Sequence, residues 1–224
     1  MCGIVGIKLE NITSEQLEKI PKLLIETEIR GKHASGISWF DYSSNRIMQI
    51  KSGVPISELI KQFDFNACVF DGNISMIAHI RYSTSDIHYH QPLGDKNLQI
   101  VHNGVITQEH PSKWKSIYGY DCKTKNDSEL IFHSLKNNKN IFEEFPDASI
   151  SALSIDNFGN IKNYRNGLRP QWISKQPNGF FIGSTKDIFS RVGLEAEKVE
   201  VQNDTEKTFR CLRSNKLKDF YKGL

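Results

Sequence analysis

The first seven residues place the strongest constraint on how this chain can fold. Cys2 follows Met1 directly and precedes Gly3 and the apolar segment 4–7, Ile-Val-Gly-Ile. A short apolar run of this kind is typical of a strand buried on both faces. Gly3 carries no side chain, so the backbone beside Cys2 can approach another group closely. The segment therefore predicts a buried first strand over residues 3–8 that holds Cys2 at its end.

Cys2 is small enough to permit removal of Met1, and we expect the mature chain to begin with this cysteine. A free α-amine has a pKa of roughly 7.7–8.0 and a thiol one of roughly 8.5. One residue would then hold both a nucleophile and a base, as in enzymes that use their own amino terminus in catalysis. The alternative is an ordinary amino-terminal strand that happens to contain a cysteine.

The composition indicates a globular protein of one large domain. The chain has 224 residues, of which 38% are apolar and 25% charged. Its apolar runs fall short of the roughly 18–20 residues needed to span a bilayer. The start lacks the basic and apolar regions of a signal peptide, so we expect a cytoplasmic protein with no membrane partner. A net charge of +3 gives little reason to expect nucleic acid as a partner.

Metal and cofactor sites are not expected. Cys68, Cys122 and Cys211 are scattered singly and form no C-x-x-C pair, which argues against a zinc ribbon and a disulfide framework. His88 and His90 lie two residues apart, but no neighbouring cysteine or carboxylate would complete a metal site. We therefore predict reduced thiols, no metal and no cofactor, with the two histidines in a loop near the mouth of a site.

The order of predicted elements favours an α+β fold with antiparallel sheets, because many short strands alternate with few helices. A capping box at Thr13–Gln16 opens a helix that Pro21 is expected to break or restart. Residues 1–224 are expected to form a single domain in which 191–224 make a carboxy-terminal strand and basic extension. Further helices are predicted at 56–63 and 127–135, and strands at 36–40, 46–51, 74–80, 98–101, 150–155, 161–164, 180–182, 199–201 and 209–212.

The basic residues of this extension are Arg210, Arg213, Lys216, Lys218 and Lys222. A solvated tail is the simpler interpretation, and docking onto an acidic partner surface is the alternative.

Four polar stretches stand where predicted strands or helices begin or end. They are residues 30–36, 79–84, 102–104 and 126–129. Taken singly, they could be salt-bridge partners, a hairpin turn at 103–104 and a helix N-cap at Asp127. Together they suit an α-amino acid with an amide side chain. An arginine can grip a carboxylate, an aspartate an ammonium, and an Asn amide beside a glycine N–H can form an oxyanion hole.

In this order, these stretches resemble class II glutamine amidotransferase domains. The resemblance rests on Met1–Gly6, R-G-x-x-A-x-G at 30–36, H-x-R-Y-x-T at 79–84, Gln91-Pro92, His-Asn-Gly at 102–104 and Asp-Ser-Glu at 127–129. Residues 165–170 are similar to the R-D-x-x-G-x-R-P-L segment of amidophosphoribosyltransferase and, in related form, asparagine synthase. The resemblance extends from residue 1 to about residue 190.

The resemblance implies a four-layer αββα sandwich, the N-terminal nucleophile hydrolase fold. It also implies hydrolysis of the glutamine side-chain amide to glutamate and ammonia through a thioester. The implied roles are Cys2 as nucleophile and base, Asn103 and Gly104 as oxyanion hole, Arg81 and Thr84 for the substrate carboxylate, Asp127 for its amine, Arg30 as support for the Cys2 terminus and Tyr82 on a loop that closes over the substrate.

The chain departs from the family pattern at His33, which stands in place of an Asp, and at Gln171 and Thr185. It also contains no S-G-G-x-D-S adenylation loop and no phosphoribosyl-pyrophosphate loop, and it is too short for a sugar isomerase domain. We therefore expect a glutaminase that passes ammonia to a separate synthase chain. The alternatives are a hydrolase of another γ-glutamyl amide and a catalytically silent regulatory module.

Overall fold

The computed structural model describes residues 2–82, 90–202 and 207–209. Two sheets face each other, and each pairing between neighbouring described strands is antiparallel. The larger sheet has the order β11 (Glu197–Lys198), β9 (Trp172–Gln176), β10 (Gly179–Gly183), β1 (Gly3–Leu9), β4 (Ile74–Arg81), β2 (Ala34–Asp41) and β3 (Arg46–Ser52). The smaller has the order β12 (Lys207–Phe209), β8 (Ile161–Arg165), β7 (Ser151–Asp156), β6 (Leu98–His102) and β5 (Leu93–Gly94).

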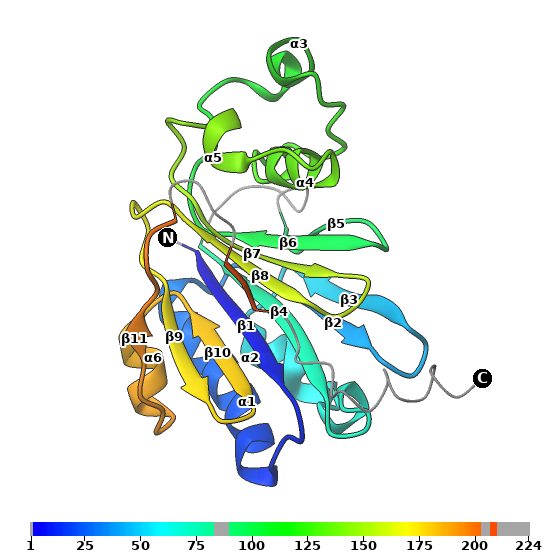
Figure 1. Cartoon of the computed structure of the whole chain (residues 1–224), viewed down its shortest axis with the longest axis vertical. Coiled ribbons are helices and arrows are strands. Elements are labelled where there is room, and N and C mark those ends of the chain that lie inside the picture. Colours follow the sequence, from blue (N-terminus) through cyan, green and yellow to red (C-terminus); the bar gives the residue numbers. More distant parts are fainter. Residues whose placement is uncertain (1, 83–89, 203–206, 210–224) are drawn as a thin grey trace, which may run out of the picture.

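A layer of helices covers the outer face of each sheet (Figure 1). One layer packs on the larger sheet and contains α1 (Ser14–Glu26), α2 (Ile56–Leu59) and α6 (Lys186–Arg191), with the 3₁₀ turns η1 (Thr27–Arg30), η2 (Ile60–Gln62) and η3 (Asn66–Cys68). The other packs on the smaller sheet and contains η5 (Pro111–Lys113), α3 (Trp114–Tyr118), α4 (Glu129–Lys136) and α5 (Ile141–Glu144).

Three apolar clusters fill the spaces between these four layers, and strand alternation explains which residue enters which cluster. Along β1, Val5, Ile7 and Leu9 pack against the α1 layer. Ile4 points the other way and joins Val101 of β6 in the cluster between the sheets, because neighbouring side chains of a strand face opposite sides. A third cluster lies between the smaller sheet and α3–α5. The αββα sandwich predicted from the sequence is confirmed.

Most predicted elements are confirmed, including both hydrogen bonds of the capping box at Thr13 and Gln16. The predicted break at Pro21 is wrong: α1 continues through it, because Ile20, Leu23 and Leu24 are buried against the sheet on both sides of the proline. The predicted strand at 199–201 is also wrong, and the chain pairs at Glu197–Lys198 instead. The edge strand β5, and β9 between β10 and β11, were not predicted.

The described residues bear on two further predictions, those of reduced thiols and of no membrane-spanning segment. Cys2, Cys68 and Cys122 are free thiols, whereas Cys211 and the basic residues at 210–222 lie outside the described residues. In the part of the chain that the structure describes, no helix combines the length and the apolar character needed to cross a bilayer.

The start of β1 is held by a side chain where the strand ladder ends. β1 pairs with β10 from Val5 onward, and one residue earlier the Ile4 N–H donates to the Ser184 Oγ at 2.8 Å. Both residues are fully buried. The hydroxyl therefore satisfies a backbone donor that would otherwise have no partner, two residues from Cys2.

Replacing this hydroxyl should destabilise the fold. We expect Ser184→Ala to lower the free energy of unfolding by about 1–3 kcal/mol, the cost of an unpaired buried N–H, as measured by urea denaturation. The control is Ser190→Ala in α6, whose exposed hydroxyl bonds only its own helix, at the Asp187 carbonyl. Equal losses in the two variants would contradict this role of Ser184.

Candidate active site

Strand pairing brings Cys2 beside Arg81. Gly3 pairs with Ile80 in the register of β1 and β4, so Cys2 lies at the level of Arg81, the last residue of β4. In Figure 1 the amino-terminal end of β1 points up towards the half of the molecule that carries α3–α5. The predicted nucleophile and the predicted carboxylate-binding arginine are therefore neighbours because of the sheet register.

A small cavity lies at this point, between the two sheets and the start of α4. Its volume is about 170 Å³. Larger hollows elsewhere reach about 430 Å³, so the residues in the wall, and not the size, single this cavity out. The wall is formed by Cys2, His79, Arg81, Tyr82, Gln91, His102, Gly104, Asn126, Asp127 and Ser128.

The cavity brings together most of the predicted site residues. Cys2, Arg81, Tyr82, Gly104 and Asp127 line it. Asn103 lies between two lining residues, and Arg30 contacts Cys2 from outside the wall. Thr84 and His88 lie outside the described residues.

Arg30 supports the backbone of Cys2. Its Nε donates to the Cys2 carbonyl at 3.2 Å. Burial lowers the pKa of the Arg30 guanidinium; Cys2 opposes this shift and the nearby Arg169 adds to it. Gly31 follows, and a Cβ there would lie 2.4 Å from the Arg81 carbonyl carbon and oxygen. The turn after η1 therefore rests directly on the end of β4, which only glycine permits.

His33, where the sequence departs from the predicted family pattern, also lies at this end of the sheet. Its N–H donates to the Arg81 carbonyl at 3.0 Å, and its ring packs against Tyr82 with centroids 5.2 Å apart. His33 thus contacts Arg81 through its backbone and Tyr82 through its ring.

Asn103 and Gly104 follow β6 in the smaller sheet, and Gly104 lines the cavity together with Cys2. Asn103 is buried, its N–H donates to the Ser151 carbonyl at 2.9 Å, and its Nδ2 has no hydrogen-bond partner. A Cβ on Gly104 would lie 1.8 Å from the Ser149 carbonyl oxygen. An unpaired buried donor is costly, and a site that receives a ligand oxygen provides a reason to keep one.

Three wall residues to which the sequence assigned no role hold the 103–104 turn. His102 Nε2 lies 3.0 Å from the Ser149 carbonyl, which can only accept, so Nε2 carries the proton. Nδ1 therefore accepts from the Ser128 Oγ at 2.8 Å. Gln91 binds the same segment twice, accepting from the His102 N–H at 2.6 Å and donating to its carbonyl at 3.2 Å.

Asp127 precedes α4 and has one oxygen fixed by the backbone. Its Oδ2 accepts from the Ile106 N–H at 2.6 Å and more weakly from the Thr107 N–H at 3.4 Å. None of the described residues donates a hydrogen bond to Oδ1. The carboxylate is thus held in one orientation while one oxygen can still accept from a ligand.

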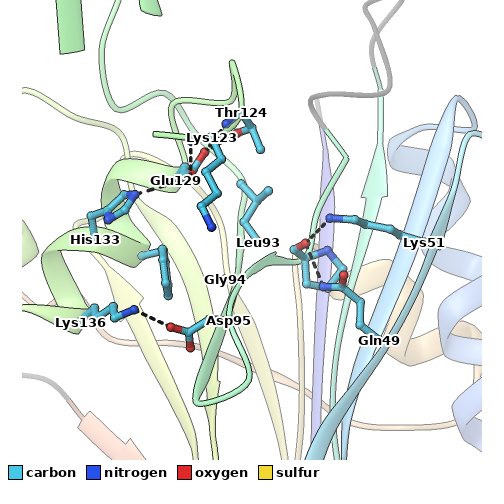
Figure 2. Close-up of a pocket in the computed structure, with 12 residues that line it drawn as sticks. Gln49, Lys51, Leu93, Gly94, Asp95, Lys123, Thr124, Glu129, His133 and Lys136 are labelled. Carbon is cyan, nitrogen blue, oxygen red and sulfur yellow. Dashed lines mark hydrogen bonds and ion pairs between the residues drawn. The ribbon is translucent and has the colours of Figure 1, made fainter. Parts of the chain in front are cut away.

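Two segments that carry wall residues are held by hydrogen bonds in a neighbouring hollow (Figure 2). They are the loop before Asp127 and the segment that contains Gln91. Glu129 accepts from the Lys123 N–H at 2.8 Å and from the Thr124 N–H at 2.7 Å, which fixes the loop before Asp127. Lys51 and Gln49 of β3 donate to the Pro92 carbonyl at 3.0 and 3.1 Å, which fixes the segment that carries Gln91.

One group of side chains beside this hollow has the composition of a metal site. Ligand atoms of Cys122, Glu129 and His133 lie within 4.8 Å of one another. The Glu129 carboxylate is already used by the loop before Asp127. Burial raises the pKa of the Cys122 thiol to about 12, with Glu129 and Asp121 contributing, so this sulfur stays protonated at neutral pH.

Comparisons with known proteins support the resemblance. No family model matches the sequence. The chain is 31% identical over 153 residues to the glutamine–fructose-6-phosphate aminotransferase of Buchnera aphidicola, covering 64% of this chain and 24% of that protein. It is also 31% identical over 153 residues to the amidophosphoribosyltransferase of Pasteurella multocida, covering 65% of this chain and 29% of that protein. The chain thus spans only about a quarter of these relatives.

Solved structures confirm the fold. A glutamine phosphoribosylpyrophosphate amidotransferase from B. subtilis superposes with a TM-score of 0.66 over 95% of this chain and 50% of its own, at 20% identity. An allosteric regulatory enzyme of purine biosynthesis matches with the same TM-score over 96% of this chain and 50% of its own, at 18% identity. The chain therefore resembles class II glutamine amidotransferase domains in both sequence and fold.

The buried histidines of the cavity should make the fold sensitive to acid. Burial lowers the pKa of His79 to about 3 and also lowers that of His102. Below the ordinary pKa of 6.5 the unfolded chain binds protons that the folded chain does not, so stability is present above this pKa and is lost as the pH falls. Each group can contribute up to about 1.4 kcal/mol per pH unit.

We therefore expect the free energy of unfolding to fall as the pH is lowered from 7 to 5, and to fall less steeply in His79→Gln. Urea denaturation at several pH values measures both slopes. The exposed His110, changed to Gln, is the control and should leave the slope as in the wild type. A wild-type stability that is constant over this range would contradict the neutral state of the two histidines.

Proposed function

We propose that this chain hydrolyses the side-chain amide of L-glutamine to glutamate and ammonia, with Cys2 as an amino-terminal nucleophile. The observation that carries the proposal is the meeting of Cys2, Arg81, Gly104 and Asp127 in one cavity. These residues come from two sheets and a helix start, and together they match the charges and the amide of glutamine. The similarity to enzymes whose names include glutamine supports it.

The proposed reaction begins with binding of the amino-acid end. The Arg81 guanidinium is suited to the substrate carboxylate, which it can grip with two parallel hydrogen bonds. The free Oδ1 of Asp127 is suited to the ammonium group. Thr84, by resemblance, would assist at the carboxylate, and Tyr82, which is 62% exposed, would close over the bound molecule.

The proposed chemistry has two stages. The Cys2 sulfur attacks the amide carbon while the α-amine of Cys2 takes the thiol proton and passes it to the departing nitrogen, so ammonia leaves and a thioester remains. Water then attacks the thioester, the same amine takes its proton, and glutamate and the thiol are regenerated. In both stages Asn103 Nδ2 and the Gly104 N–H would stabilise the oxyanion, and Arg30 would hold the Cys2 carbonyl.

The proposed fate of the ammonia is transfer to a synthase on a separate chain. Residues 1–224 would then act as one glutaminase unit. The matched relatives are named for the transfer of nitrogen to an acceptor and are about four times as long as the matched region. Purified with glutamine alone, this chain would release free ammonia. Transfer of amide nitrogen to a small acceptor by this chain unaided would contradict this part of the proposal.

Loss of the nucleophile should abolish the activity. We expect Cys2→Ala to reduce glutamine hydrolysis by at least about 1000-fold, because no other group can form the thioester. Ammonia release at saturating glutamine measures it, and mass spectrometry of the intact wild type should show that Met1 is absent. Cys122→Ala is the matched control, because its thiol lies outside the cavity. Equal rates of Cys2→Ala and wild type would refute the proposal.

Two further variants should separate chemistry from binding. Asn103→Ala should lower kcat by about 100- to 1000-fold with little change in KM, as expected for an oxyanion-hole donor. Arg81→Lys should chiefly raise KM, because a lysine cannot form the two parallel hydrogen bonds to a carboxylate. Steady-state kinetics with glutamine distinguishes the two patterns. A KM effect in Asn103→Ala together with a kcat effect in Arg81→Lys would contradict the proposed roles of the two residues.

A further inference from the structure

His79 is a wall residue of the cavity that takes no part in the reaction proposed for Cys2. It lies on β4, at the centre of the larger sheet, and pairs with Ile4 of β1 on one side and Gly36 of β2 on the other. It precedes Arg81 by two positions, a distance of about 6.6 Å along a strand, and the two side chains face the same side. Only 1% of its surface is exposed to solvent, and its ring lines the cavity with Cys2.

The His79 ring carries a buried nitrogen without a partner. Its Nε2 makes no hydrogen bond, whereas both ring nitrogens of His102 in the same wall are paired with Ser128 and Ser149. Buried polar atoms are nearly always satisfied, and the exceptions need an explanation such as a bound water or a functional role. Nε2 is therefore suited to bind a polar atom of a molecule that enters the cavity.

The charge state of His79 limits what this atom can do. Burial lowers its pKa to about 3, and electrostatic interactions with Arg81, His102 and His90 act in the same direction. The imidazole is consequently neutral at physiological pH, with one N–H donor and one acceptor. It can form a hydrogen bond to a neutral amide but does not bring a charge to the site.

The position of His79 matches one end of the proposed substrate. In an extended glutamine four bonds separate the carboxylate carbon from the amide carbon, so the two groups can reach towards side chains that lie two positions apart on a strand. A molecule whose carboxylate meets Arg81 at the end of β4 can therefore present its amide to the next inward-facing residue of the same strand. That residue is His79.

We propose that His79 contacts the substrate, and that its Nε2 hydrogen-bonds the amide group of the glutamine side chain. The inference rests on the proposed glutaminase function and adds a catalytic residue to it. Because none of the described residues pairs with this nitrogen, His79 is retained at a cost to stability. A residue kept for packing would stabilise the fold instead. Measuring stability and activity together therefore tests the proposal.

The test compares stability and activity in His79→Leu and His79→Gln. Leucine has a similar volume and no polar atom, so His79→Leu should unfold at the wild-type temperature or above it while kcat/KM for glutamine falls at least about tenfold. Glutamine at this position offers a donor and an acceptor, so His79→Gln should recover part of the lost kcat/KM. The control, His110→Leu, removes an exposed histidine from outside the cavity and should leave kcat/KM unchanged.

Each outcome has a distinct meaning. Wild-type activity in His79→Leu would overturn the role of His79 and leave the glutaminase proposal intact. Loss of both stability and activity in the two variants would also overturn it, since His79 would then be a structural residue. If Cys2→Ala and wild type hydrolyse glutamine equally, the glutaminase proposal fails, and the role of His79 fails with it.

Discussion

The candidate site depends on a strand that is buried on both faces and ends in a cysteine. β1 pairs with β4 and β10 at the centre of the larger sheet, and its side chains enter one apolar cluster on each face. Such a strand has one register, because a slip by one residue would exchange the two faces. The register fixes Cys2 at the level of Arg81, and the Ser184 hydroxyl extends this hold to Ile4. The core of the protein is thus also what positions Cys2.

The polar groups in and beside the wall of the cavity divide into those that have hydrogen-bond partners among the described residues and those that do not. Gln91, His102 and Ser128 bind one another and hold the 103–104 turn against β7. Asn103 Nδ2 and His79 Nε2 remain unpaired although both residues are buried. The paired groups can therefore keep their geometry before a substrate binds, while the unpaired groups offer hydrogen bonds that only an incoming molecule can complete. A preorganised polar site needs both kinds of group.

The sequence predicted those features that depend on local pattern. The apolar runs of β1, β4 and β6, the capping box at Thr13 and the strand-terminal position of Arg81 follow from periodicity and residue type, and the structure confirms them. β9 was missed because Trp172–Gln176 mixes polar and apolar residues and is stabilised by its pairing with β10. The break predicted at Pro21 was wrong because the packing of α1 against the larger sheet outweighed the loss of one helical hydrogen bond.

The missed residues of the site have a different cause. His79 and Ser128 lay within stretches that the sequence singled out, and Gln91 within the resemblance, but their contacts join residues far apart in the chain. The Gln91–His102 pairing spans 11 residues and the His102–Ser128 bond spans 26. No periodicity in the sequence encodes such contacts, because they arise only when the smaller sheet and α4 meet across the end of β4. The sequence could therefore indicate which residues carry charge and nucleophilicity, whereas the residues that hold or complement them emerge from the packing of the two sheets.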